Sequence, residues 1–184
     1  MRMKVLALSA AAVAVAGILS TPAHAAVPAM GTGNPYQDIQ TGVSYTVYQP
    51  TNTLGAKRTG SPYPNWCYAG SDAEQNLSVN YSKGNRRAFS VSEANPLCFD
   101  FGIGPKVGTV QVMGRTAVIT AYCSFTDASC SRNDVFTHGG NLRVKLPAAK
   151  GLRETDLVIE TPAKGLTASQ LEIVAQSLRP VYSS

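Results

Sequence analysis

Histidine is scarce in this chain. Of the two histidines, His24 lies near the N-terminus and only His138 lies in the body of the sequence. Zinc sites combine closely spaced cysteines with further Cys or His ligands, and the sequence contains no such set. The Cys-x-x-Cys redox motif and the Gly-x-Ser-x-Gly nucleophile motif are also missing. The Gly-x-Gly of Phe101–Pro105 lacks the third glycine of a phosphate-binding loop. We therefore expect neither a metal nor a cofactor.

Long apolar runs are missing beyond the N-terminus. The chain opens with Arg2 and Lys4, continues with an apolar run from Val5 to Leu19, and then reaches the small-residue motif Ala23-His24-Ala25. This layout is typical of a signal peptide, and the run is shorter than the roughly 20 residues of a membrane-spanning helix. We expect cleavage before Ala26 and a mature protein that is secreted, extracellular or associated with the cell envelope. An uncleaved anchor is the alternative.

Charge is low as well. The chain has 16 basic and 11 acidic residues, and loss of Arg2 and Lys4 with the signal peptide leaves a formal charge of about +3. This charge is too small to indicate a nucleic-acid partner. Three basic residues gather at Lys83, Arg86 and Arg87 around Gly84-Asn85, a pair typical of a turn. We expect either a solvated hairpin tip or a contact with an anionic envelope polymer or lipid surface. Apart from that, we expect the chain to contact a membrane only through its signal peptide during export.

The four cysteines form an even set, Cys67, Cys98, Cys123 and Cys130. In an oxidising compartment such a set predicts two disulfides, with three possible connectivities. We expect Cys123 to pair with Cys130, because they are close along the chain, and Cys67 then pairs with Cys98. The short segment CSFTDASC between Cys123 and Cys130 would then be a stapled loop.

After the signal peptide, residues 1–25, the pattern predicts a flexible, exposed lead-in over 26–41 and a single α+β domain over 42–184. Residues 50–76 contain too many turn formers for regular structure. Alternating or β-branched stretches elsewhere predict a curved antiparallel sheet of about six to seven strands. These stretches are Val43 to Tyr48, Leu77 to Tyr81, Ala88 to Val91, Thr109 to Val112, Thr116 to Cys123, Asn141 to Leu146 and Leu157 to Thr161.

The C-terminal end has the most regular pattern, from Leu166 to Leu178. Thr167 followed by Gln170 three residues later is typical of a capping box. Apolar residues then recur at the spacing of one helix face, at Leu171, Val174, Ala175 and Leu178. We expect one C-terminal helix that ends before Pro180 and packs on a face of the sheet.

The run from Val107 to Val181 contains a GTVQVMGRTAVI hairpin, a GGNLRV strand, a TDLVIE strand and a closing GLTASQLEIVAQSL helix. It resembles the C-terminal unit of small secreted actinobacterial proteins of unknown function. It is also similar in plan to the last strands and helix of envelope-stress sensor and anti-sigma-associated domains. The resemblance implies a curved antiparallel sheet with a helix in its concavity and, for some relatives, sensing or binding at the envelope. It carries no catalytic residue onto this chain.

Two arrangements are candidates for catalysis. His138 follows Asp134 in a polar segment, so a histidine base oriented by a carboxylate is one hypothesis and an exposed loop histidine is the other. Glu93 and Asp100 flank Cys98 and form a possible carboxylate pair, although acids fall this close by chance. Either arrangement would make the protein a small secreted hydrolase.

Surface recognition is the other class of function. Tyr63, Trp66 and Tyr68 could form an aromatic platform for a glycan or proline-rich peptide, or Trp66 could instead pack against a disulfide of Cys67. A cavity between sheet and helix could hold an acyl chain or peptide, or the core could be fully packed there. We therefore expect a disulfide-stapled, non-catalytic binding or sensing module for an unknown envelope component or a small apolar or glycan ligand.

Overall fold

A computed structural model describes residues 33–60, 65–66, 75–97, 101–124, 126–127 and 129–181. The helices are α1 Pro35–Gln40, α2 Asp134–His138 and α3 Ala168–Gln176. The strands are β1 Tyr48–Pro50, β2 Lys57–Thr59, β3 Asn65–Trp66, β4 Gln75–Lys83, β5 Arg86–Ala94, β6 Lys106–Val112, β7 Arg115–Ala121, β8 Gly139–Leu146, β9 Thr155–Pro162 and β10 Leu178–Pro180. None of the described helices is long and apolar enough to cross a membrane.

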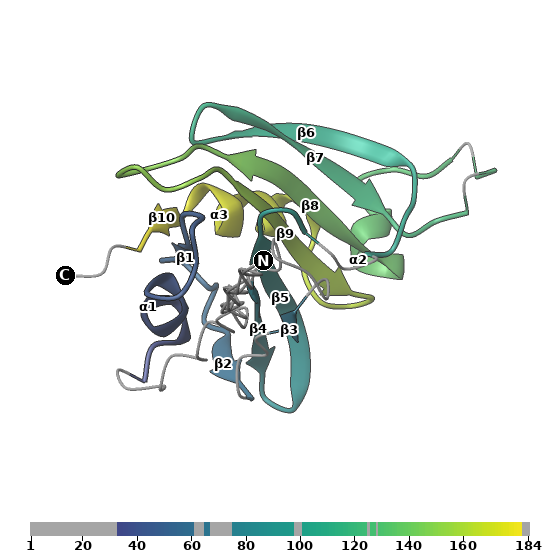
Figure 1. The fold of residues 1–184 in the computed structure, drawn as a ribbon. Coiled ribbons are helices and arrows are strands. Elements are labelled where there is room, and N and C mark those ends of the chain that lie inside the picture. Colours follow the sequence, from purple (N-terminus) through teal and green to yellow (C-terminus); the bar gives the residue numbers. More distant parts are fainter. Residues whose placement is uncertain are drawn as a thin grey trace, which may run out of the picture.

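The fold is mostly β. Seven antiparallel strands follow one another in the order β2-β4-β5-β9-β8-β7-β6, β3 adds to β4, and β1 with β10 forms a separate two-stranded sheet. Figure 1 shows β6 and β7 at one end of the main sheet and β2 near the other. The expected antiparallel sheet is present, but the described part of the chain has three small helices where one was expected.

One face of the main sheet forms the core. The strand register aligns Val79 with Val91, Val91 with Ile159, and Ile159 with Leu142. Side chains aligned in this way lie on the same face, and these four are at most 2% exposed. Leu171 and Val174 of α3 belong to the same buried cluster, and α3 contacts β6, β8 and β9. The opposite face, which we call the outer face, carries the alternate residues of each strand.

The start of α3 agrees with the sequence and its end does not. The Thr167 hydroxyl accepts a hydrogen bond from the Gln170 backbone N–H at 3.2 Å, and the Gln170 side chain accepts one from the Thr167 N–H at 3.0 Å. The expectation of a helix up to Leu178 was wrong, because α3 ends at Gln176. Leu178 begins β10, whose pairing with β1 buries it completely. Leu178 is therefore buried as expected, but in a strand and not in a helix.

The expected exposed lead-in over 26–41 is corrected only where the structure describes it, from residue 33 onward. Asn34 accepts a hydrogen bond from the Tyr36 N–H at 3.1 Å and so caps α1, which has Pro35 at its first turn. Tyr36 and Ile39 are 0% and 5% exposed, and they join the core cluster. Proline is well suited to the first turn, where its missing N–H costs nothing. Regular structure also occurs within 50–76, where β2 and β3 pair with β4.

Candidate functional site

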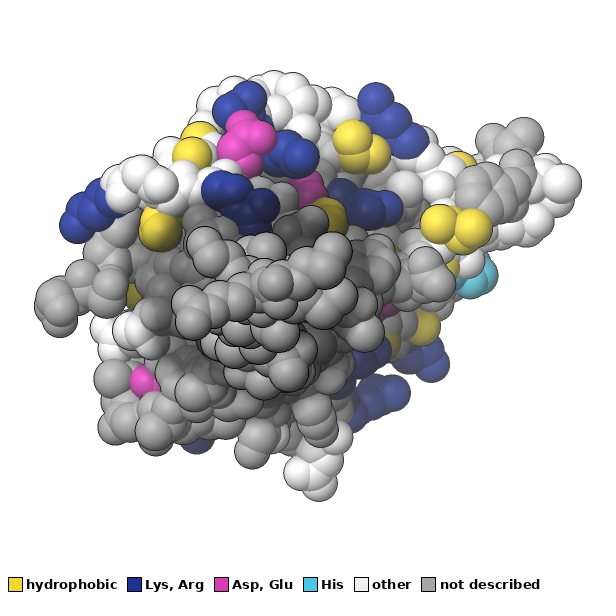
Figure 2. All heavy atoms as spheres, in the orientation of Figure 1, with side chains coloured by type: hydrophobic (Ala, Val, Ile, Leu, Met, Phe, Trp, Pro, Cys, Tyr) yellow, Lys and Arg dark blue, Asp and Glu magenta, His cyan; other side chains and the backbone are white. Residues whose placement is uncertain are grey.

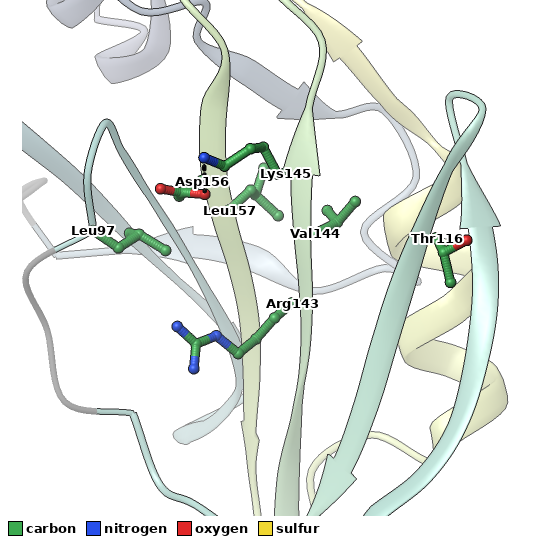
Figure 3. A pocket seen from close by; sticks show the side chains of 7 residues that line it. All are labelled: Leu97, Thr116, Arg143, Val144, Lys145, Asp156 and Leu157. Carbon is green, nitrogen blue, oxygen red and sulfur yellow. Dashed lines mark ion pairs between the residues drawn. The ribbon is translucent and has the colours of Figure 1, made fainter.

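A pocket of about 260 Å³ opens on the outer face over β7, β8 and β9. Its lining residues are Leu97, Thr116, Arg143, Val144, Lys145, Asp156 and Leu157 (Figure 3). We call it the outer-face pocket. The alternation of β8 sends Leu142, Val144 and Leu146 into the core and leaves Arg143 and Lys145 on the opposite side. A half-buried strand thus supplies the charged wall.

Two of the charges in the pocket compensate each other. Lys145 is directly aligned with Asp156 across β8 and β9, and its Nζ lies 3.6 Å from Asp156 Oδ1. Their side chains are 57% and 27% exposed, so this pair lies at the surface and contributes little to stability. Its effect on the pocket is to hold an ammonium and a carboxylate side by side.

Arg143 supplies the third charge. It is aligned with Val118 on β7 and Val158 on β9, so two β-branched residues flank it. Its guanidinium carbon lies 5.9 Å from the centroid of the Phe101 ring. Among the described residues no carboxylate lies within 4.0 Å of it. Within the described part of the chain, the pocket therefore carries one positive charge that no carboxylate compensates.

Next to Arg143 along the outer face, a polar network is already satisfied internally. Thr120 donates to Asn141 Oδ1 at 2.7 Å, Asn141 Nδ2 donates to the Gly102 carbonyl at 2.9 Å, and the Tyr122 hydroxyl donates to Glu160 at 2.8 Å. Burial is the main cause that raises the pKa of Tyr122, so its hydroxyl remains a donor. Beside the pocket, these groups are thus hydrogen-bonded to one another and to the Gly102 carbonyl.

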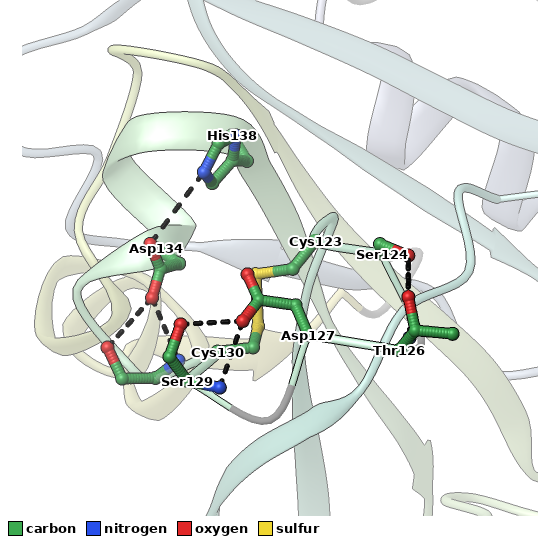
Figure 4. The surroundings of a disulfide bond; sticks show 9 residues. Cys123, Ser124, Thr126, Asp127, Ser129, Cys130, Asp134 and His138 are labelled. Atoms are coloured by element: carbon green, nitrogen blue, oxygen red, sulfur yellow. Dashed lines mark hydrogen bonds and ion pairs between the residues drawn. A yellow bond between two sulfur atoms is a disulfide. The ribbon is translucent and has the colours of Figure 1, made fainter.

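The Cys123–Cys130 disulfide is present as expected, with 6.1 Å between the Cα atoms. Cys67 and Cys98 lie outside the described residues, so their pairing stays a prediction. Hydrogen bonds surround the staple: inside the closed loop Ser129 donates to Asp127, and just after it both the N–H and the hydroxyl of Ser131 donate to Asp134 at 2.8 Å (Figure 4). Hydrogen bonds from the serine side chain and backbone lower the pKa of Asp127 and of Asp134.

His138 lies at the end of α2 and not in a loop, since Asp134–His138 forms one helical turn. Its Nε2 is 3.8 Å from Asp134 Oδ1, and its side chain is 50% exposed. The nearby hydroxyls of Ser129 and Ser131 donate to carboxylates and not to the imidazole. The Cys123 and Cys130 sulfurs and an Asp134 oxygen lie within 4.8 Å of one another. Because those sulfurs are bonded together, they offer no thiolate to a metal.

Glu93 lies on the core face of β5 and is fully buried. Its Oε2 accepts a hydrogen bond from the Tyr48 N–H at 2.7 Å, while Oε1 has no partner among the described residues. Burial raises its pKa well above the usual value, against the opposing effect of that hydrogen bond. Its proposed partner Asp100 lies outside the described residues. Glu93 aligns with Leu157 and Gly139 with Pro162, so about 17 Å of strand separates Glu93 from the α2 end.

The recognition residues expected from the sequence are placed only in part. Lys83 and Arg86 face each other across the turn between β4 and β5, and both are exposed, as is Arg87. Trp66 is aligned with Gln75 through its backbone. Tyr63 and Tyr68 lie outside the described residues. Figure 2 shows basic side chains with acidic ones between them on the upper part of the face in view.

The residues of the outer-face pocket were not singled out from the sequence. The sequence predicts a strand over Asn141 to Leu146, in which Leu142, Val144 and Leu146 alternate with polar residues, so that Arg143 and Lys145 fall on its solvent-facing side. Asp156 comes from a different strand, and only the register of β8 against β9 brings it to Lys145.

No family model matches the chain, and no curated protein or solved structure matches it either. The likeness of Val107 to Val181 to secreted actinobacterial proteins therefore stays an expectation.

Proposed function

We propose that this chain is an exported, disulfide-stapled module that acts by binding, in the extracellular space or at the cell envelope, and not by catalysis. The observation that carries the proposal is the Cys123–Cys130 disulfide. Disulfides persist in oxidising compartments and are rare in the cytosol of most organisms. The expected signal peptide over residues 1–25 supports the same compartment.

The placement of the ionisable groups supports binding over catalysis. Glu93 is buried within the core, whereas His138 and Asp134 lie on α2 beside the disulfide. General acid–base catalysis needs such groups within hydrogen-bond reach of one substrate. The outer-face pocket is open and carries Arg143, Lys145 and Asp156, which are groups that hold and orient a ligand.

A small secreted hydrolase is the second candidate, and one observation favours it. His138 Nε2 and Asp134 Oδ1 lie 3.8 Å apart, which is within ion-pair range but longer than the hydrogen bond that orients a histidine base. Against it, Asp134 already accepts two hydrogen bonds from Ser131, and no described serine hydroxyl donates to His138.

Expression of the full chain in a secreting bacterial host separates these candidates. We expect the protein in the exported fraction, with no turnover of p-nitrophenyl esters or glycosides above that of a His138→Ala variant. Turnover that is lost in His138→Ala and reduced in Asp134→Asn would establish the hydrolase. Retention of the full-length chain in the cytoplasm would refute the proposed compartment.

A further inference from the structure

We propose that the outer-face pocket binds a small hydroxylated monocarboxylate, of the chemical class of the sugar acids, with Arg143 as the carboxylate-binding residue. This inference rests on the proposed binding function and names the ligand class for it.

The charges of the pocket select a single negative charge. The ammonium of Lys145 is compensated by Asp156 at 3.6 Å, and Arg143 is left with no carboxylate near it among the described residues. Counted over the described residues, the pocket therefore has a net charge of +1 and matches a monoanion. A dianionic phosphate would bring its second charge toward the Asp156 carboxylate, where like charges repel.

The chemistry of Arg143 fits a carboxylate. A guanidinium presents a planar fork of N–H donors that bonds both oxygens of a carboxylate. In this protein, the Phe101 ring lies beside the guanidinium, and Val118 and Val158 flank its strand position. Apolar neighbours exclude water from one side of the ion pair and so strengthen it.

The remaining polar groups fit hydroxyls. Thr116 Oγ1 accepts a hydrogen bond from Gln111 Nε2 at 2.9 Å, and its own O–H can rotate to donate to a ligand oxygen. Asp156 binds Lys145 through Oδ1, and its Oδ2 remains to accept a ligand hydroxyl. One donor and one acceptor beside a cation suit a ligand that carries hydroxyls as well as its carboxylate.

The volume limits the size of the ligand. About 260 Å³ is below the roughly 300 to 1,000 Å³ that is typical of pockets for drug-sized ligands. The pocket therefore holds one ring or a short chain, with Leu97 supplying an apolar wall opposite the charged strands (Figure 3). Thr116, Arg143, Lys145 and Asp156 stand on three adjacent strands, so the sheet fixes the spacing of their backbone positions.

The test is an NMR titration of the ¹⁵N-labelled mature protein with glucuronate, with glucose and inorganic phosphate as parallel probes. We expect saturable shifts for Thr116, Lys145 and the Arg143 Nε–H with glucuronate, none with glucose, and weaker binding of phosphate. Arg143→Ala should weaken glucuronate binding about 10- to 100-fold, as expected for loss of hydrogen bonds to a charged group. Asp156→Asn should raise the affinity for phosphate relative to glucuronate.

Arg115→Ala is the matched control. Arg115 is an exposed arginine on β7 that is paired with Glu154 at 3.0 Å and does not line the pocket, so its removal should leave glucuronate affinity within about twofold. Equal binding of glucose and glucuronate, equal affinity in Arg143→Ala, or tighter binding of phosphate would overturn the proposal. Those results would contradict the sugar-acid pocket and leave the proposed exported binding module untouched. Ester or glycoside turnover by His138 would instead contradict the proposed binding function and say nothing about the pocket.

Discussion

The carboxylate of Glu93 accepts a hydrogen bond from the backbone N–H of Tyr48 at 2.7 Å inside the core. This contact ties β5 of the main sheet to β1 of the two-stranded sheet. The Tyr36 and Tyr81 hydroxyls, 2.8 Å apart, form a second buried polar contact, which ties α1 to β4. The N-terminal elements are thus joined to the sheet by polar groups as well as apolar ones, and the carboxylate makes that junction sensitive to pH.

Glu93→Gln should stabilise the protein at neutral pH. Burial raises the folded-state pKa of Glu93 above its ordinary value of 4.5, so the folded protein holds this proton more tightly than the unfolded chain. The stability that this group contributes is complete below pH 4.5 and falls as the pH rises through the folded-state pKa. A difference of one between the folded-state and unfolded-state pKa of Glu93 corresponds to about 1.4 kcal/mol of unfolding free energy.

Urea unfolding of wild type and Glu93→Gln between pH 4 and 8 checks this prediction. The variant's advantage should be largest at the alkaline end and should shrink toward pH 4, because glutamine resembles the protonated acid. A difference that stays constant across this range would mean that Glu93 is not held with a raised pKa.

Leu171→Ala should lower the free energy of unfolding by about 2 to 5 kcal/mol, because it opens a cavity under α3. Leu171 is completely buried, whereas Ile173 on the same helix is 42% exposed. Ile173→Ala is therefore the matched control, with an expected loss below about 1 kcal/mol. Similar losses in the two variants, measured by urea unfolding, would contradict the packing of α3 on the sheet.

The Cys123→Ala/Cys130→Ala double variant should lose about 2 to 3 kcal/mol of unfolding free energy, because the loop it frees is short. The bridge spans a sequence separation of 7 residues. Hydrogen exchange should also rise at the amides of Ser129, which donates to Asp127 inside the stapled loop, and of Ser131, which donates to Asp134 just after it. Unchanged exchange at these amides would show that the loop is ordered without its staple.

Thr167→Ala should cost about 1 kcal/mol, since it removes the N-cap of α3. Gln170→Ala removes the other half of the capping box, and the double variant should lose less than the sum of the two single losses. Strict additivity in thermal or urea unfolding would mean that the two hydrogen bonds do not act together.

The local patterns of the sequence predicted local structure well. The alternation of Leu142, Val144 and Leu146 correctly placed them in the core, at 0%, 5% and 0% exposure, and the Thr167 cap was found. Local patterns did not distinguish a helix from a strand at Leu178, because its burial comes from β1, far along the chain. A helix of six residues such as α1 is likewise too short for periodicity to reveal it.

The candidate site was less accessible to prediction, because it depends on register. Lys145 and Asp156 are eleven positions apart in sequence, and they meet only because β8 and β9 pair with Lys145 opposite Asp156. A shift of one residue would send Arg143 and Lys145 to the core face. Glu93 could not be placed from the sequence either, because nothing in the sequence around a charged residue shows that it is buried.

The protein is proposed to be exported and cross-linked by disulfides, and peptide mapping of the secreted protein without reduction tests this directly. We expect a chain that begins near Ala26, with Cys123 linked to Cys130 and Cys67 linked to Cys98. Free thiols at Cys123 and Cys130, or a full-length chain that keeps residues 1–25, would contradict it.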